Sequence, residues 1–133
     1  MTAPSHRIRV IAWVMLGMYL CLAVWLTHIP HPPDVVEVAA DKVLHFIGYA
    51  GYASFLYIAL GLSFPRLRFL WLIVPTILGI WAALDELTQP LFHRDCDIYD
   101  WRADMIGVCA AVAVLTMLRI IFERRPAPSP VSS

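Results

Sequence analysis

Three short stretches of the sequence combine acidic side chains with histidine, glutamine or a basic residue at helical spacing. Asp41 and His45 are four residues apart, as are Asp85 and Gln89, so each pair shares one face of a helix. Carboxylate, imidazole and amide groups that lie together can accept hydrogen bonds, pair as ions or divide acid and base roles. The candidate site residues are Asp41, Lys42, His45, Asp85, Glu86, Gln89, Arg94, Asp100 and Asp104.

Several of these residues also have a simpler interpretation. Asp41 could have no role beyond complementing the dipole at the start of a helix. Asp100 could likewise serve simply as the N-cap of another helix. Lys42, the only lysine in the chain, could extend toward the membrane surface or pair with a neighbouring acid. For His45, inside an apolar run, a functional and a structural role are both open. Solvated loops suffice for three further acids, Glu37, Asp95 and Asp97.

Asp104 is harder to explain as a solvated residue. It lies near the start of the last apolar segment, on a helix face that continues through Gly107 and Ala111. Ala103, Gly107 and Ala111 form a ridge of small residues, the kind of surface that lets membrane helices approach closely. We therefore expect Asp104 to point into a helix bundle. The same ridge leaves a homodimer open, because it could equally pack against a second copy.

The elements that must position these residues follow from length and composition. The chain has 133 residues, 60% of them hydrophobic and 15% charged, whereas soluble domains have about 25% charged residues. A transmembrane helix needs about 20 mostly apolar residues, and four segments meet or approach this length. The sequence predicts an all-α fold, a four-helix transmembrane bundle in one domain over residues 1–125. Helices are expected at about 9–28, 42–64, 68–88 and 101–123, followed by a disordered tail at 126–133.

Charge is distributed unevenly between the two sides of this bundle. Seven of the ten cations fall on the side that holds both termini and the middle connection. Positive charge is typical of cytoplasmic segments, so we expect cytoplasmic termini and a multi-pass protein of the inner (cytoplasmic) membrane. The other side carries nine of the ten acids. The resulting net charge of zero excludes a generic nucleic-acid binder.

The sequence predicts no metal site and no cofactor. The three cysteines, Cys21, Cys96 and Cys109, show no zinc-ribbon spacing. The loop that contains His93 and Asp95 has metal-capable side chains, but their spacing matches no zinc pattern. The sequence also has no Gly-rich phosphate loop and no nucleophile elbow, so no residue is identified as a nucleophile.

Three motifs resemble those of the VanZ-like family of small integral membrane proteins. The segment Asp41–Phe46 matches the family's D-K-x-x-H-F pattern at the start of a helix, and Asp85–Gln89 matches D-E-x-x-Q. Arg94, followed by Asp100 and Gly107, matches R-x5-D-x6-G. The resemblance covers about residues 41–107, together with the frame of four apolar segments.

The chain departs from the family pattern at two places. The family usually has asparagine where this chain has Asp104, and a Pro-Gly pair before the arginine, where this chain has Phe92 and His93. The family's namesake is associated with low-level resistance to the glycopeptide teicoplanin, without an established reaction. The resemblance therefore implies a role in the cell envelope and no particular chemistry.

The sequence leaves three functions open. In the first, an outward-facing polar pocket binds a membrane lipid of the envelope or a glycopeptide-like ligand, with Lys42 and Arg94 holding an anionic group. In the second, the carboxylates and His45 act as acid and base in an intramembrane enzyme. In the third, the same residues form an ion-pair clasp between helices. A proton-coupled transporter is disfavoured, because the inner halves of the segments carry few polar residues.

Overall fold

The computed structural model describes residues 4–27, 38–92 and 95–123. Within them the chain forms four α-helices, α1 (His6–Thr27), α2 (Val38–Ser63), α3 (Leu70–Thr88) and α4 (Ile98–Glu123), and a short 3₁₀ turn, η1 (Gln89–Phe92). Each α-helix is long and apolar enough to cross a membrane. The expected all-α, four-helix transmembrane bundle is confirmed. Arg94 and the tail at 126–133 lie outside the described residues.

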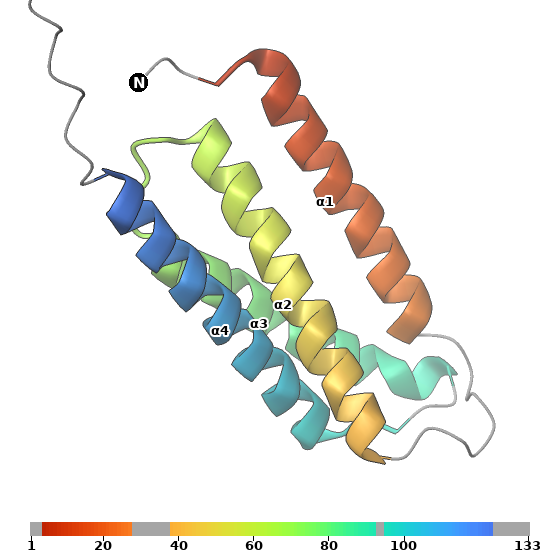
Figure 1. Ribbon diagram of the computed structural model, residues 1–133. Helices are drawn as coiled ribbons and strands as arrows, with labels where there is room; N and C mark the ends of the chain where they lie inside the picture. Colours follow the sequence, from red (N-terminus) through yellow and green to blue (C-terminus); the bar gives the residue numbers. More distant parts are fainter. Residues whose placement is uncertain (1–3, 28–37, 93–94, 124–133) are drawn as a thin grey trace, which may run out of the picture.

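Successive helices run in opposite directions, so the start of α1 and the end of α4 lie at the same end of the bundle (Figure 1). The most extensive contact joins α2 to α4, while α3 packs mainly on α4 and α1 packs on α2. The opposite end brings together the starts of α2 and α4 and the end of α3 (Figure 1). The cytoplasmic placement of the termini stays a prediction.

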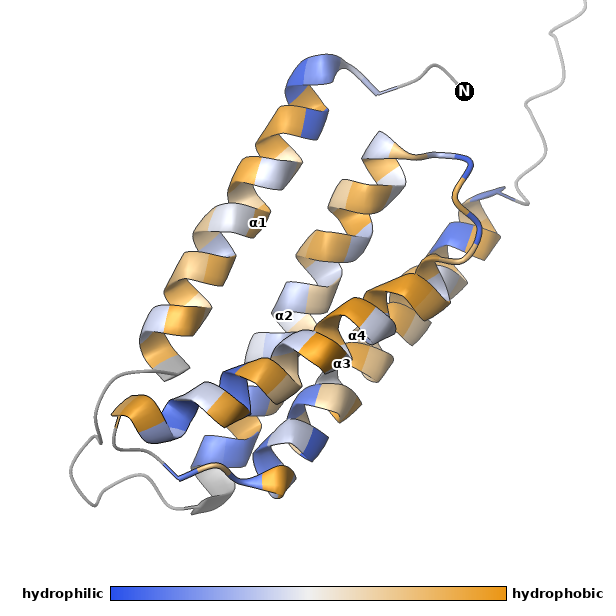
Figure 2. Cartoon of the chain, turned by 180° about the vertical axis from the view of Figure 1, so that it is seen from behind, coloured by the Kyte–Doolittle hydropathy of each residue, from blue (hydrophilic) through white to orange (hydrophobic). Residues whose placement is uncertain are grey.

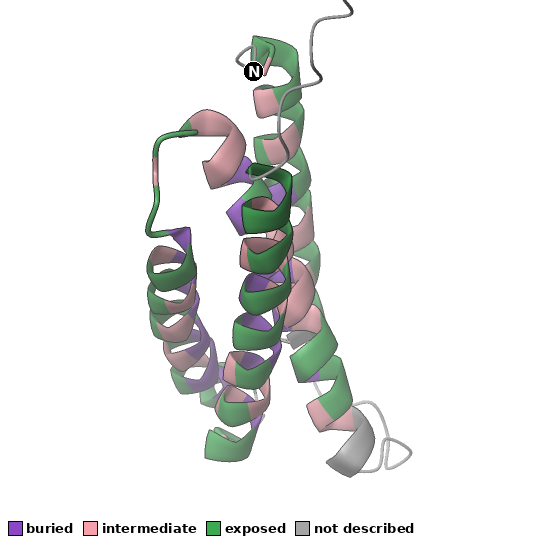
Figure 3. Cartoon of the chain, turned by 60° about the vertical axis from the view of Figure 1, so that its left-hand side comes forward, coloured by how far each residue is buried: buried purple, intermediate pink, exposed green. Residues whose placement is uncertain are grey.

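At this second end of the bundle, apolar side chains are exposed and acidic side chains are buried, the opposite of the arrangement in a soluble protein. Leu87 is 69% exposed, whereas the adjacent Glu86 is only 3% exposed. Hydrophobic residues predominate along the helices (Figure 2), and many large ones, such as Trp25 and Met117, are exposed. Buried residues lie on the sides of the helices that face one another (Figure 3). Exposed apolar groups next to buried carboxylates are expected where the surrounding solvent is lipid. The chain is therefore a multi-pass membrane protein.

Gly107 marks the closest approach of α2 and α4. A Cβ atom at this position would collide with the carbonyl oxygen of Phe46 and would lie 3.2 Å from the backbone nitrogen of Ala50. Gly107 is buried in the described chain. The ridge of small residues thus serves the packing of helices within one chain at Gly107. A homodimer stays a prediction.

The end of the bundle where α1 begins and α4 ends has its own polar contacts. The guanidinium group of Arg119 donates hydrogen bonds to the backbone oxygens of Leu67 and Pro65, both at 3.0 Å, and to the Glu123 carboxylate at 2.8 Å. These bonds attach the end of α4 to the connection between α2 and α3. The buried acids Asp85, Glu86, Asp100 and Asp104 all lie at the other end.

Candidate functional site

The described candidate residues lie together at the end of the bundle where α2 and α4 begin. We use the name acidic cluster for these residues and one additional acid, Asp97. Helix α2 contributes Asp41, Lys42 and His45; α3 and η1 contribute Asp85, Glu86 and Gln89; α4 and the residue before it contribute Asp97, Asp100 and Asp104. Arg94, the ninth candidate, lies outside the described residues.

Asp97 forms the N-cap of α4. Its carboxylate oxygen Oδ1 accepts a hydrogen bond from the Tyr99 backbone N–H at 2.8 Å, and its carbonyl accepts one from the Asp100 N–H at 3.0 Å. This is the arrangement of an acidic cap that satisfies the free N–H groups of a helix start. Two expectations are therefore wrong, since Asp97 is not a free loop residue and Asp100 is not the cap. The cap also explains why α4 begins at Ile98 instead of 101.

Lys42 joins α2 to the start of α4. Its ammonium group donates to Asp100 Oδ1 at 2.7 Å and to Asp97 Oδ2 at 2.9 Å. The side chain of Asp100 is 6% exposed, while those of Lys42 and Asp97 are each about one third exposed. Of the two alternatives for Lys42, the structure therefore shows pairing with neighbouring acids.

The charge of Asp97 makes stability depend on pH. The Tyr99 N–H and the Lys42 ammonium lower the pKa of Asp97 below its ordinary value. A lowered folded-state pKa stabilises the fold above the unfolded value of about 3.9, and this contribution is lost as pH falls through the folded value. We expect the difference in the free energy of unfolding between wild type and Asp97→Asn, measured in detergent from about pH 6 to pH 2, to shrink in this acidic range.

Asparagine is itself a good N-cap, so Asp97→Asn removes the charge and keeps the cap. The control is Asp95→Asn, which changes an exposed acid in the same short connection and is expected to leave the unfolding free energy nearly unchanged at each pH. A difference for Asp97→Asn that stays constant down to the lowest pH would contradict the assignment.

His45 and Asp104 form a buried contact between α2 and α4. His45 Nδ1 lies 2.9 Å from Asp104 Oδ1, and His45 Nε2 lies 3.9 Å from Asp100 Oδ2. His45 is 6% exposed and Asp104 is fully buried. The second oxygen of Asp104, Oδ2, is buried without a hydrogen-bond partner in the described chain. Asp104 therefore points into the bundle, as the ridge of small residues predicts.

The end of α3 brings a second buried carboxylate to α4. Glu86 Oε2 accepts a hydrogen bond from the Asp97 backbone N–H at 3.0 Å, and Glu86 Oε1 accepts one from Gln89 Nε2 at 3.0 Å. Gln89 is fully buried, and its oxygen Oε1 has no hydrogen-bond partner in the described chain. Pro90 follows directly, and α3 gives way to the 3₁₀ turn η1 before it.

Asp85, the residue before Glu86 in α3, contacts α2. The Tyr49 hydroxyl donates to Asp85 Oδ2 at 3.5 Å, and the Tyr49 ring packs against the Tyr52 ring with centroids 6.1 Å apart. Asp85 is 7% exposed. Tyr49 was not among the candidate residues. It follows His45 by four residues, and this helical spacing could have identified it from the sequence.

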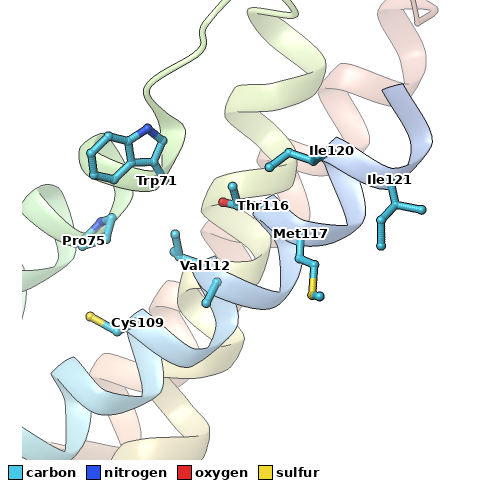
Figure 4. A pocket seen from close by; sticks show the side chains of 9 residues that line it. Trp71, Pro75, Cys109, Val112, Thr116, Met117, Ile120 and Ile121 are labelled. Atoms are coloured by element: carbon cyan, nitrogen blue, oxygen red, sulfur yellow. The ribbon is translucent and has the colours of Figure 1, made fainter. Parts of the chain in front are cut away.

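Apolar grooves run along the helices outside the acidic cluster. One groove of about 530 Å³ lies between α1, α2 and α3, and its lining extends from Trp13 to Leu84, the residue before Asp85. Another, of about 680 Å³, lies between α3 and α4 (Figure 4). It is lined by residues such as Pro75 and Met117 and contains no member of the acidic cluster. The lining of the first groove therefore comes within one sequence position of a member of the acidic cluster, Asp85.

The arrangement is rich in hydrogen-bond acceptors and poor in positive charge. Its six carboxyl groups face one ammonium group and one imidazole among the described residues. Such a site suits a cation or a group with several N–H or O–H donors.

A comparison of the chain with protein-family models, curated proteins and solved structures finds no match.

Proposed function

We propose that this chain is a VanZ-like membrane protein that binds an envelope lipid, with the polar headgroup at Asp85 and a lipid chain in the groove between α1, α2 and α3. One observation carries the proposal, namely that this apolar groove is lined by Leu84, the residue before the buried Asp85, and by Tyr52, whose ring packs against the Tyr49 that donates to Asp85. A long apolar groove with one polar end matches the shape and polarity of an amphiphile.

A chain of aromatic contacts supports the link between the two parts. Tyr52 lines the groove and packs against Tyr49, whose hydroxyl donates to Asp85. The polar end of the groove is therefore continuous with the acidic cluster. Tyrosine suits this position, because its ring is apolar and its hydroxyl needs a polar partner.

The chemistry of the acidic cluster favours a headgroup that donates hydrogen bonds. Carboxylates are acceptors only, so amines, amides and sugar hydroxyls are the complementary groups. Lys42 is already paired with Asp97 and Asp100, which leaves no unpaired cation within the described part of the acidic cluster for an anionic headgroup. The three sequence motifs support the VanZ-like assignment and, with it, an effect on susceptibility to teicoplanin.

The groove is tested by filling it. A Cβ atom at Gly17 meets no neighbouring atom, so Gly17→Trp places a large side chain in the groove without a backbone collision. We expect this variant to retain about tenfold less phosphatidylethanolamine than wild type in native mass spectrometry. Ala113→Trp fills the groove between α3 and α4 and is the matched control, with unchanged retention. Equal lipid retention by Gly17→Trp and wild type would refute the proposal.

The headgroup contact is tested with Asp85→Asn. Wild type is expected to prefer phosphatidylethanolamine to phosphatidylcholine, whose quaternary ammonium has no N–H to donate. Asp85→Asn is expected to lose this preference, because the amide carries no charge and also presents donors. A preference that survives the substitution would place the headgroup elsewhere.

A structural clasp is the second candidate function. Specific contacts favour it, because the hydrogen bonds of Lys42, His45 and Glu86 each join two different parts of the bundle. In that case the acidic cluster would hold α2, α3 and α4 together and bind nothing. A chain that has only this structural role is expected to retain the same amount of lipid in Gly17→Trp as in wild type, which separates this candidate from lipid binding.

A further inference from the structure

We infer that His45, Glu86 and Asp104 form a binding site for a divalent transition-metal ion. The three residues come from α2, α3 and α4, and one ligand atom of each lies within 4.8 Å of the other two. All three side chains are buried, with exposures of 6%, 3% and 0%. Their sequence positions show no metal pattern, because each ligand comes from a different helix.

The distances suit coordination to one ion. Metal bonds to imidazole nitrogen and carboxylate oxygen are about 2.0–2.2 Å long, so two ligands of a tetrahedral ion stand about 3.4 Å apart. His45 Nδ1 and Asp104 Oδ1 are 2.9 Å apart, so a small separation of the two groups would admit an ion between them. His45 Nε2 lies 3.9 Å from Asp100 Oδ2, which adds a further negative charge near the imidazole.

Two buried oxygen atoms in or next to this group lack a hydrogen-bond partner in the described part of the chain, which is a second observation in favour of a bound ligand. Asp104 Oδ2 belongs to the carboxylate that contacts His45, and Gln89 Oε1 belongs to the amide that contacts Glu86. An unsatisfied buried polar atom costs about 1–3 kcal/mol. A cation between the two carboxylates would satisfy Asp104 Oδ2.

Charge also favours a cation at this position. Lys42 binds Asp97 and Asp100, so Glu86 and Asp104 share only the imidazole of His45 as a basic group among the described residues. Two buried carboxylates with one imidazole are compensated by a doubly charged ion. A second group, Asp41 with His45 and Asp100, also has suitable spacing. It is the weaker choice, because Lys42 already supplies a positive charge to Asp100.

The donor set indicates the class of metal. One imidazole nitrogen with carboxylate oxygens and no thiolate suits Zn²⁺ or Mn²⁺, whereas Mg²⁺ and Ca²⁺ prefer oxygen ligands alone. The test uses the full chain in detergent without added lipid, stripped with EDTA and titrated calorimetrically with each ion alone. We expect one Zn²⁺ per chain, bound at least about tenfold more tightly than Mg²⁺. No Zn²⁺ binding by the wild type would overturn the inference.

Two substitutions locate the ion. Glu86→Gln removes a proposed ligand charge and is expected to weaken Zn²⁺ binding by more than about tenfold. Asp95→Asn, the control, removes an exposed acid outside the group and is expected to keep the wild-type affinity. Equal binding by Glu86→Gln and wild type would show that Zn²⁺ binds elsewhere, for example at surface histidines, and would also overturn the inference.

A measurement on the wild type covers the case in which Glu86→Gln fails to fold. X-ray absorption by the Zn²⁺-loaded chain is expected to show nitrogen and oxygen ligands at about 2.0–2.2 Å, with one imidazole. A spectrum without imidazole would exclude His45 as a ligand. The metal site does not rest on the proposed lipid binding, and the two fail separately: Asp85→Asn tests the headgroup and Glu86→Gln tests the ion.

Discussion

Replacing Gly107 by alanine is expected to destabilise the bundle by about 2–3 kcal/mol, measured as the free energy of unfolding in mixed detergent micelles. The added Cβ atom would collide with the carbonyl oxygen of Phe46, which belongs to the backbone of α2. A backbone atom has no other rotamer to adopt, so α2 and α4 must move apart. Overpacking of this kind typically costs about 1–3 kcal/mol, and this contact is the most extensive in the bundle.

Two other glycines provide matched controls for this substitution. A Cβ atom at Gly48 of α2 or Gly17 of α1 meets no atom within 4 Å. Gly48→Ala and Gly17→Ala are therefore expected to leave the unfolding free energy unchanged, or to raise it by the better helix propensity of alanine, about 1 kcal/mol at most. A Gly107→Ala variant as stable as these controls would contradict the close packing of α2 on α4.

The architecture could be predicted from the sequence because it depends on properties that are summed over whole segments. About 20 apolar residues are enough to identify a membrane helix, and a segment keeps this property when a few of its residues are polar. His45 within α2 and Asp104 within α4 therefore did not obscure the prediction of helices. The ridge at Gly107 could also be predicted, because small residues at a spacing of four are a local pattern.

The contacts within the acidic cluster could be predicted only in part. Helical spacing places Asp85 and Gln89 on one face, yet Gln89 donates to Glu86 and Asp85 accepts from Tyr49 of another helix. Such pairings depend on how each helix is rotated about its axis, which residue spacing does not determine. Asp97 was assigned to solvent for the same reason, since its partner Lys42 lies 55 positions earlier in the chain.

Asp104→Ala is expected to lower the free energy of unfolding by about 3–5 kcal/mol, the cost of breaking a buried pair. The substitution leaves His45 Nδ1 buried without its 2.9 Å contact to Asp104. It also removes side-chain volume from a fully buried position, which adds to the loss. The measurement is equilibrium unfolding in mixed micelles, with the exposed substitution Asp95→Asn as a control that is expected to have no comparable effect.

The double variant His45→Leu/Asp104→Leu decides what this pair is for. Replacing a buried pair by apolar residues of similar volume is often neutral or stabilising, so the double variant is expected to recover most of the stability that Asp104→Ala loses. If the double variant is stable and binds Zn²⁺ as the wild type does, the pair acts only as a clasp, and an apolar contact replaces it. If it is stable but no longer binds Zn²⁺, the two polar side chains serve ligand binding, because the fold does not require them. A double variant as unstable as Asp104→Ala would contradict the replacement of the pair by an apolar contact.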